Sequence, residues 1–372
     1  ELKTLSPLSN ATLTTDESVI APPTVLLPDD FAVCETAIIR KLKQLFDPHY
    51  GGFGHHQKFP HTQALRYLIG KTEQVRDPDM EVMLLKTLDA MQNGGLQDRF
   101  EHGFFRYCTT REWSIPHYEK MLEDNLALCE LFGRAAMRFH RVDYLQTAWQ
   151  TMQYIENTLR DPVTGLFSGS QDADETYYQK PLLARGALKA PDVDATVYTD
   201  WNALAIPAYL ALNRPMDTQH HLEKLFKQVY RADGVIHCAS DGVQPVLLKD
   251  SAQLLHAMLQ CHAARTGDWE KNCLELAQHI HEQFFDAQHH AFKDLATDSK
   301  HVGLLLHPQY PLAENSLMIE NLLLLDQLDP PNHWKTLALE TFSHYYFEFE
   351  NRGIFAAPYA WTAFLLRKRK GS

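Results

Sequence analysis

The sequence lacks any apolar stretch that approaches the roughly 18 residues needed to cross a membrane, and it lacks the basic-then-apolar start of a signal peptide. It also lacks an excess of positive charge, because 35 lysines and arginines stand against 47 acidic residues, a net charge of −12. The one basic block, Arg367 to Lys370, comes at the C-terminal end. A surface of this sign repels phosphate backbones, so we expect neither a nucleic acid nor a membrane as partner.

Closely spaced metal and redox motifs are missing as well. The six cysteines contain no CxxC pair, which excludes a zinc ribbon or a thioredoxin-type centre made from these residues. The 20 histidines include no HExxH, and adjacent pairs such as His220 and His221 point apart on a helix. We therefore expect buried reduced thiols, no metal site and no cofactor. The cysteine pattern favours the cytoplasm, while export stays open because the residues before Glu1 are unseen.

What the sequence does have is apolar material for a large core, since 45% of its 372 residues are hydrophobic. Residues 1–30 are rich in Thr, Ser and Pro and are expected to form a linker or an extended segment, with the folded domain over 31–372. Apolar residues recur at helical spacing in stripes over 31–45, 80–91, 121–137, 145–159, 254–259, 274–285, 317–328 and 337–347. No series of alternating strands accompanies them, so we expect an all-α protein with short strands only in loops.

A repeated pattern follows many of these stripes: an acidic turn and then, often, a glycine and an apolar residue. It occurs near residues 47, 93, 161, 233, 286 and 350, at intervals averaging about 61 residues, which suits two helices and two connections. Six such hairpins predict an (α/α)6 toroid, in which inner helices form a funnel and outer helices cover them. An open solenoid is the alternative. The long connections 94–116 and 165–199 suit a pocket at one mouth of a ring.

The first candidate site group follows a glycine-rich turn at Gly51 to Gly54. Lys58, Phe59 and His61 place a cation, an aromatic ring and an imidazole just before a helix. The glycines permit positive φ and the close approach of a ligand. The structural alternative is a tight connection in which His61 partly caps the helix.

The segment from Phe104 to Asn125 holds the second group, which consists of Arg106, Tyr107, Trp113, His117 and Glu119. Pro116 fixes the start of an expected helix, and His117 and Glu119 would occupy its first turn. A carboxylate buried at a funnel mouth has a raised pKa and could act as general acid or base, with His117 as a second proton carrier. The alternative is that Glu119 caps the helix, and for Glu123 we expect a solvated side chain.

Two further groups are polar segments in or beside the long connections. Asp172 and Asp174 lie in a polar loop and could bind sugar hydroxyls or protonate a leaving group, although the loop lacks the glycine and glutamate of an EF-hand. Trp201 and Asn202 open a helix, where an indole beside hydrogen-bonding groups suits a carbohydrate. Asp250 and Glu314 open later helices in the same manner. Solvated turns, core packing and helix caps are the structural alternatives.

These motifs resemble a family of uncharacterised proteins related to spermatogenesis-associated proteins, which join a thioredoxin-like domain to a six-hairpin glycosidase-like region. The matching stretches are GGFGHHQKFPH from Gly51, GFFRYCTTREWSIPHYEKMLEDN from Gly103, FSGSQDADE from Phe167, TDWNALAI from Thr199 and ENS from Glu314. The resemblance implies the (α/α)6 barrel, a sugar or glycan as ligand, and a separate thioredoxin-like domain or protein as partner. Phe105 stands where the family has a histidine, and Gln171 where it has a glutamate.

Three functions compete. In a sugar epimerase or isomerase, His117 and Glu119 would move the proton next to the carbonyl, Arg106 or Lys58 would stabilise the enolate oxygen, and Trp201 would stack on the sugar. In a glycoside hydrolase, Asp172 or Asp174 would face Glu119 across the scissile bond. In a non-catalytic module, the substituted positions Phe105 and Gln171 would leave a site that only binds a glycan or a protein.

Overall fold

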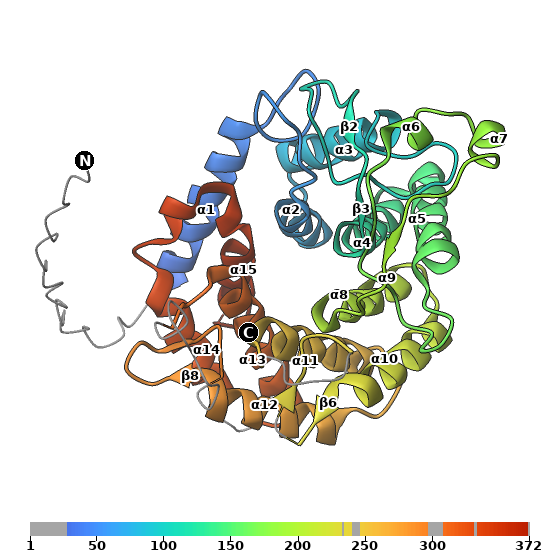
Figure 1. Ribbon diagram of the computed structural model, residues 1–372. Coiled ribbons are helices and arrows are strands. Elements are labelled where there is room, and N and C mark those ends of the chain that lie inside the picture. Colours follow the sequence, from blue (N-terminus) through green and yellow to red (C-terminus); the bar gives the residue numbers. More distant parts are fainter. Residues whose placement is uncertain (1–27, 233, 240–245, 297–307, 331–332, 371–372) are drawn as a thin grey trace, which may run out of the picture.

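The computed structural model describes residues 28–232, 234–239, 246–296, 308–330 and 333–370. Its helices form two concentric rings, which Figure 1 shows along the common axis. The expected linker over 1–30 lies outside the described residues except for its last three, which begin the first helix. Among the described residues, no helix has the length and apolar content that a membrane span requires.

The inner ring consists of six helical segments, one of which is broken at Leu204. They are α2 (Thr62–Gln74), α4 (Leu122–Phe139), α8 with α9 (Thr199–Ala203 and Ala205–Ala211), α11 (Leu248–Ala263), α13 (Leu312–Leu328) and α15 (Ala357–Lys370). Contacts run from α2 to α4, α9, α11, α13 and α15 and then back to α2, so the ring closes. Closure excludes the open solenoid.

Six outer helices cover this ring, each packed on an inner helix next to it. They are α1 (Pro28–Leu45) on α15, α3 (Pro78–Asn93) on α2, α5 (Val142–Tyr154) on α4, α10 (Pro215–Val229) on α9, α12 (Glu270–Phe284) on α11 and α14 (Trp334–Tyr345) on α13. The π-helical turn η1 (Ile155–Leu159) extends α5, and the 3-10 helix η3 (Phe349–Ala356) joins α14 to α15. The predicted (α/α)6 toroid is confirmed.

The helix expected to start at Pro116 begins at Leu122 instead, because residues 116 and 117 pair as a strand, so His117 and Glu119 lie in the connection before the helix. Within the described residues, the strands are each two residues long and lie in the connections, as expected. They are β1 (Tyr107–Cys108) with β2 (Pro116–His117), β3 (Lys120–Met121) with β4 (Ser170–Gln171) and β5 (Val193–Asp194), β6 (Tyr230–Arg231) with β7 (Gly234–Val235), and β8 (Phe285–Asp286) with β9 (Ala291–Phe292). All pairs are antiparallel. The short helices α6 (Glu175–Tyr178) and α7 (Leu182–Arg185) lie in the loop between α5 and α8.

The repeated acidic turn has a physical basis in the connections from outer to inner helices. Four of these connections begin with an aspartate that is followed six residues later by a phenylalanine. The aspartates are Asp47, Asp98, Asp161 and Asp286. Each aspartate accepts a hydrogen bond from the backbone N–H two residues on, at 2.9–3.1 Å. The fifth residue of each turn has positive φ, which explains the glycines at 51 and 165. Of the other predicted positions, Asn93 is the last residue of α3 and the turn begins only at Asp98, 350 lies in η3, and Asp233 lies outside the described residues.

One large cluster of buried apolar residues runs through all twelve hairpin helices. Five of the six cysteines, namely Cys34, Cys108, Cys129, Cys261 and Cys273, belong to it as reduced thiols, as expected. Burial raises the pKa of each of these thiols, so they are poor nucleophiles.

Candidate active site

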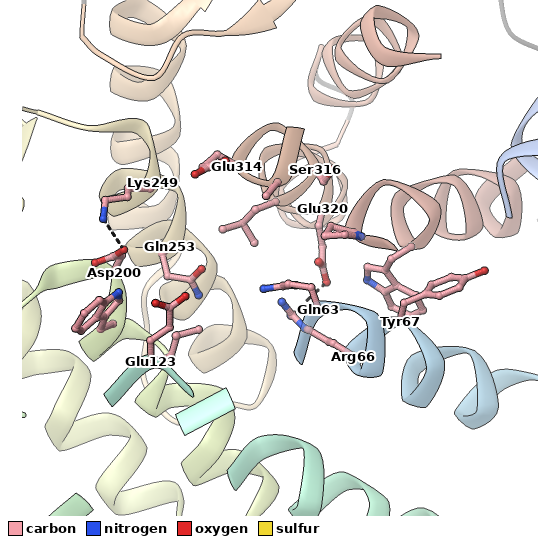
Figure 2. A pocket seen from close by; sticks show the side chains of 16 residues that line it. Gln63, Arg66, Tyr67, Glu123, Asp200, Lys249, Gln253, Glu314, Ser316 and Glu320 are labelled. Atoms are coloured by element: carbon pink, nitrogen blue, oxygen red, sulfur yellow. Dashed lines mark ion pairs between the residues drawn. The ribbon is translucent and has the colours of Figure 1, made fainter. Parts of the chain in front are cut away.

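A cavity of about 350 Å³ occupies the end of the toroid where the inner helices begin. Figure 2 shows its side chains pointing inward from several helices. Its lining consists of Gln63, Arg66, Tyr67, Glu123, Asp200, Trp201, Leu204, Lys249, Gln253, Ala313, Glu314, Ser316, Leu317, Glu320, Pro358 and Trp361. The second residue of every inner helical segment is in this set. The cavity is therefore the funnel mouth at which six helix N-termini, with their positive partial charges, converge.

Three asparagines fix the starts of inner helices by the same contact. Asn125 accepts a hydrogen bond from the N–H of Phe104 at 2.6 Å and donates to the carbonyl of the same residue at 2.9 Å. Asn202 holds Phe167 and Asn315 holds Phe292 in the same way, with distances of 2.8–2.9 Å. Each asparagine also donates to the carbonyl four residues back. This clamp joins the phenylalanine of the acidic turn to the next inner helix, and it sets how the residues just before each asparagine enter the funnel.

Glu123 and Glu314 are the carboxyl groups best placed for proton transfer. They start α4 and α13, which are third neighbours in a ring of six and so lie on opposite walls. Glu123 is open to solvent within the funnel, yet burial by the surrounding walls and then the nearby Asp200 charge raise its pKa. Burial likewise raises the pKa of Glu314. A carboxyl with a raised pKa keeps its proton closer to neutral pH and can serve as an acid or base.

Two cations complement these acids. Lys249 Nζ lies 3.0 Å from Asp200, and although burial opposes its charge, the Asp200 carboxylate raises its pKa overall. Arg66 lies 3.9 Å from Glu130 and 3.9 Å from Glu320. Arg66 and Glu320 also line a second cavity, of about 560 Å³, and therefore form the floor between the two.

The buried side chain of His256 positions Arg66 through a hydrogen bond. His256 Nδ1 lies 2.8 Å from Asn321 Oδ1, and the amide nitrogen of Asn321 donates to the carbonyl of Ala252 at 2.8 Å, which assigns Oδ1 as the acceptor. His256 Nδ1 therefore carries the proton, and Nε2 accepts from Arg66 at 3.1 Å and from Gln260 at 3.0 Å. Burial lowers the pKa of His256, so the neutral ring is favoured.

Two indoles line opposite walls of the funnel. Trp201 starts the broken helix α8–α9 and packs on Tyr198 with ring centroids 4.5 Å apart. Trp361 lies on α15, the third neighbour of that segment in the ring. A Cβ on Gly70 would come within 2.7 Å of the Trp361 ring, so this glycine permits the close approach of α2 to the indole. Paired aromatic walls with polar groups between them suit a sugar ring.

Asp250 is fully buried next to Asp200, behind the part of the funnel wall that Asp200 lines. It accepts hydrogen bonds from the N–H of Asp200 at 3.2 Å and from His237 Nδ1 at 3.0 Å. Burial raises the pKa of Asp250, and the hydrogen bond raises the pKa of His237, so the pair retains a proton between them. Within the described ranges, Asp200, His237 and Asp250 form the one His/Asp group whose ligand atoms are close enough for a metal ion. Lys249 already occupies one side of Asp200, which weakens that option.

Of the residues predicted from sequence, Trp201 and Glu314 line the funnel and Asp250 supports its wall. Six others gather at the rim: Phe59, His61, Arg106, Tyr107, His117 and Glu119. Arg106 donates to Glu119 Oε2 at 2.8 Å, and His117 Nε2 lies 3.7 Å from the same oxygen. The structure thus brings the first two predicted groups together beside the funnel.

Three predicted residues are buried in structural contacts. Lys58 contacts the carboxylate of Asp47 at 3.0 Å and two backbone carbonyls of the glycine-rich turn. Trp113 is 1% exposed and packs so closely on Gly52 that a Cβ there would lie 2.5 Å from its ring. Asn202 is the helix clamp described above. These contacts account for all three residues without a ligand.

The remaining predicted residues, Asp172 and Asp174, lie in the loop that carries α6, outside the funnel lining. Asp174 caps α6 by accepting the N–H of Tyr177 at 2.9 Å, and Asp172 is exposed. The two substituted family positions have structural partners here. Phe105 packs against Tyr118 and Tyr178, and the buried Gln171 is 3.3 Å from the hydroxyl of Tyr154.

Sequence reasoning missed most of the funnel, including Gln63, Arg66, Glu123, Asp200, Lys249, Gln253, Glu320 and Trp361. A signal for part of this set was present. Glu123 and Asp200 each precede an asparagine clamp by two residues, and Glu314 precedes one directly. Arg66, Glu320 and Trp361 lie deeper on their helices and have no local signal, because their convergence depends on ring closure.

We expect the free energy of unfolding to depend on the ionisation of Asp124, a half-buried residue that follows Glu123. Burial, and then the Glu123 charge, raise the pKa of Asp124 to about 7. Since the unfolded chain loses this proton near pH 4, stability falls as the pH rises from about 4 to 7. Asp124→Asn removes this loss, so it should stabilise the protein by about 2–4 kcal/mol at pH 8, with no difference near pH 3.

Urea unfolding of Asp124→Asn and of the parent chain across this pH range would measure the difference. Asp268→Asn, at a side chain that is 93% exposed, is the matched control and should show no such dependence. A constant offset between Asp124→Asn and the parent at all pH values would contradict the raised pKa.

Comparison with known proteins gives partial sequence matches and a fold match. No protein-family model matches the chain. Spermatogenesis-associated protein 20 of Mus musculus is 34% identical over 152 residues, which is 40% of this chain and 19% of the relative. An uncharacterised protein of Caenorhabditis elegans is 38% identical over 138 residues, 35% of this chain and 18% of the relative. The matched segment therefore spans about a fifth of the length of these relatives.

The solved structures show the fold. A sugar epimerase from a ruminal bacterium superposes with a TM-score of 0.70 at 12% identity, covering 87% of each chain. A family 76 glycoside hydrolase from a Bacteroides thetaiotaomicron strain superposes with a TM-score of 0.61 at 10% identity, covering 92% of this chain and 78% of the other. The chain thus has the (α/α)6 toroid fold of these solved structures and is homologous over part of its length to spermatogenesis-associated protein 20, which confirms the resemblance expected from its motifs.

Proposed function

We propose that this protein is a carbohydrate-active enzyme that transfers protons between a sugar in the funnel and the opposed carboxyl groups Glu123 and Glu314. Epimerisation or isomerisation next to the sugar carbonyl is the favoured reaction. The observation that carries this proposal is the pair of acids with raised pKa values on opposite walls of one cavity. Proton removal from one face and return on the other requires two such groups.

The other funnel residues suit the remaining steps. Trp201 and Trp361 offer faces on which a pyranose stacks, and Gln63 and Gln253 can bind its hydroxyl groups. Burial raises the pKa of both Glu123 and Glu314. The proposed reaction needs one of the two to be ionised and the other protonated. The ionised group takes the proton from the carbon next to the carbonyl, and the protonated group returns one.

Negative charge then develops on the carbonyl oxygen, and three features stabilise it. Arg66 is held at the floor of the funnel by His256 and two carboxylates. Lys249 adds a second cation at the mouth. The converging N-termini of the inner helices supply positive partial charge in the same space. The fold likeness to an enzyme named sugar epimerase supports a sugar as substrate class.

Glycoside hydrolysis is a second candidate, favoured by the excess of acids in the funnel. Four carboxylates, Glu123, Asp200, Glu314 and Glu320, face two cations, Arg66 and Lys249. An acidic site favours the cationic transition state of glycosidic cleavage, in which one carboxyl protonates the leaving oxygen. The fold likeness to a family 76 glycoside hydrolase supports this alternative.

NMR in D₂O tests these reactions directly. The purified chain is incubated with a panel of reducing monosaccharides and disaccharides, and spectra are followed for deuterium at C2, new sugars and cleavage products. We expect deuterium at C2 together with an epimer or a ketose. Cleavage of a disaccharide without deuterium at C2 would show glycoside hydrolysis in place of epimerisation or isomerisation.

Saturation transfer from the protein to a sugar without turnover would contradict catalysis and leave the glycan-binding module of the third hypothesis. If no sugar shows deuterium exchange, cleavage or saturation transfer, the result would contradict a carbohydrate ligand. The thioredoxin-like partner implied by the family resemblance stays a separate prediction, which a pull-down with a thioredoxin-like domain would test.

A further inference from the structure

A row of aromatic rings lies on the rim beside the funnel, and we call these five residues the rim ladder. Phe59 and Tyr107 stack with centroids 4.7 Å apart, and Tyr107 and His117 stack at 5.2 Å. His61 lies 6.2 Å from Phe59 and 6.0 Å from Phe355, which completes the row. The ladder thus joins three separate segments of the chain.

Backbone pairing explains why these rings align. Tyr107 pairs with His117 in the β1–β2 register, so their side chains lie on one face. Lys58 forms an isolated bridge with Cys108, with hydrogen bonds of 2.8 and 2.9 Å, and this bridge brings Phe59 beside Tyr107. The hydrogen-bonded backbone therefore holds Phe59, Tyr107 and His117 in a row.

Three of the five ladder side chains are exposed to solvent, although apolar rings are usually buried, and those of His61 and Tyr107 are half-buried. Phe355 is 70% exposed and Phe59 is 40% exposed, and the side chain of His117 is 41% exposed. Polar groups flank the rings at one end, where Arg106 and Glu119 form their ion pair. Exposed rings bordered by hydrogen-bonding groups suit a ligand that has both C–H faces and hydroxyl groups.

The ladder is continuous with the funnel at both ends. His61 and Phe355 come two and three residues before Gln63 and Pro358, which line the cavity. At the other end, Arg106 is near enough for its charge to act on the pKa of Glu123. A ligand that extends out of the funnel on this side would therefore lie next to the ladder.

We propose that the rim ladder binds further sugar units of an oligosaccharide whose end unit occupies the funnel. This inference rests on the proposed function, because it assigns the substrate class of the same site: a glycan chain rather than a free monosaccharide. The ladder residues act as a binding surface, and the proton-transfer groups remain those of the funnel.

Titration calorimetry with mono-, di- and tetrasaccharides of one linkage series tests the inference, with gluco-, manno- and xylo-oligosaccharides as probes. We expect the tetrasaccharide of the preferred series to bind about tenfold or more tighter than its monosaccharide, the gain typical of one or two aromatic contacts. In Phe59→Ala and Phe355→Ala this ratio should fall towards one. Phe347→Ala, at a ring that is 75% exposed elsewhere, is the matched control and should keep the ratio.

The outcomes separate the two proposals. A monosaccharide that binds as tightly as its tetrasaccharide would overturn the ladder and leave the proposed function intact. A length dependence that both ladder variants retain would place the additional contacts elsewhere and overturn the ladder as well. Absence of binding by sugars of every length would overturn the proposed function, and the ladder with it.

Discussion

Glu123→Gln and Glu314→Gln are each expected to lower turnover by about 10²- to 10⁴-fold, the usual contribution of a general acid or base. Glutamine keeps the shape of the side chain but cannot carry the transferred proton at neutral pH. Each residue lines the funnel in the first turn of its helix, so the fold should persist. The measurement is the rate of deuterium incorporation or of product formation by NMR, with circular dichroism as a check on folding.

The control for this pair is Glu282→Gln, on the outer helix α12 and exposed to solvent. It should leave turnover unchanged. If both funnel variants kept the parent rate, the opposed carboxyl groups would not be the proton-transfer groups, and the rim pair Glu119 and His117 would become the next to substitute. Loss of folding in both variants would instead assign Glu123 and Glu314 a structural role.

Asn202→Ala should cost about 3–5 kcal/mol of unfolding free energy, which is large for one polar side chain. The amide of Asn202 is completely buried and makes hydrogen bonds of 2.8–2.9 Å to both backbone groups of Phe167 and to the carbonyl of Tyr198. Its removal leaves both backbone groups of Phe167 without partners, and each orphaned group costs about 1–3 kcal/mol. The Tyr198 carbonyl still accepts the backbone N–H of residue 202. Urea unfolding followed by circular dichroism measures the change.

Asn93→Ala provides the matched comparison, because this exposed asparagine makes one hydrogen bond, to Asp89 within its own helix. We expect it to cost less than about 0.5 kcal/mol. Equal costs for the two variants would show that the clamp adds little to stability. Because Asp200 and Trp201 directly precede the clamp, Asn202→Ala should also weaken sugar binding at temperatures where the protein remains folded.

The outer helices were the easier part to predict. Five of the six, α1, α3, α5, α12 and α14, coincide with stripes expected from the sequence, since one face of each meets water and the other meets the inner ring. The sixth, α10, has an apolar stripe at Leu222, Leu225 and Val229 that sequence analysis passed over. Inner helices are harder because they are covered on several sides. The helix α9 is apolar nearly all round and contains Pro207, so it shows no helical period.

The sequence by itself determined the number of hairpins, because the acidic turns and their phenylalanines are local features that repeat at hairpin length. It did not decide between a closed ring and an open solenoid. It also identified a set of special residues, six of which meet at the rim. Only the tertiary structure decided which acids and cations face one cavity. Residues as distant as Gln63 and Pro358 meet there solely because the ring closes, and no local pattern encodes that closure. Burial in that shared space raises the pKa values of Glu123 and Glu314, on which the proposed proton transfer rests.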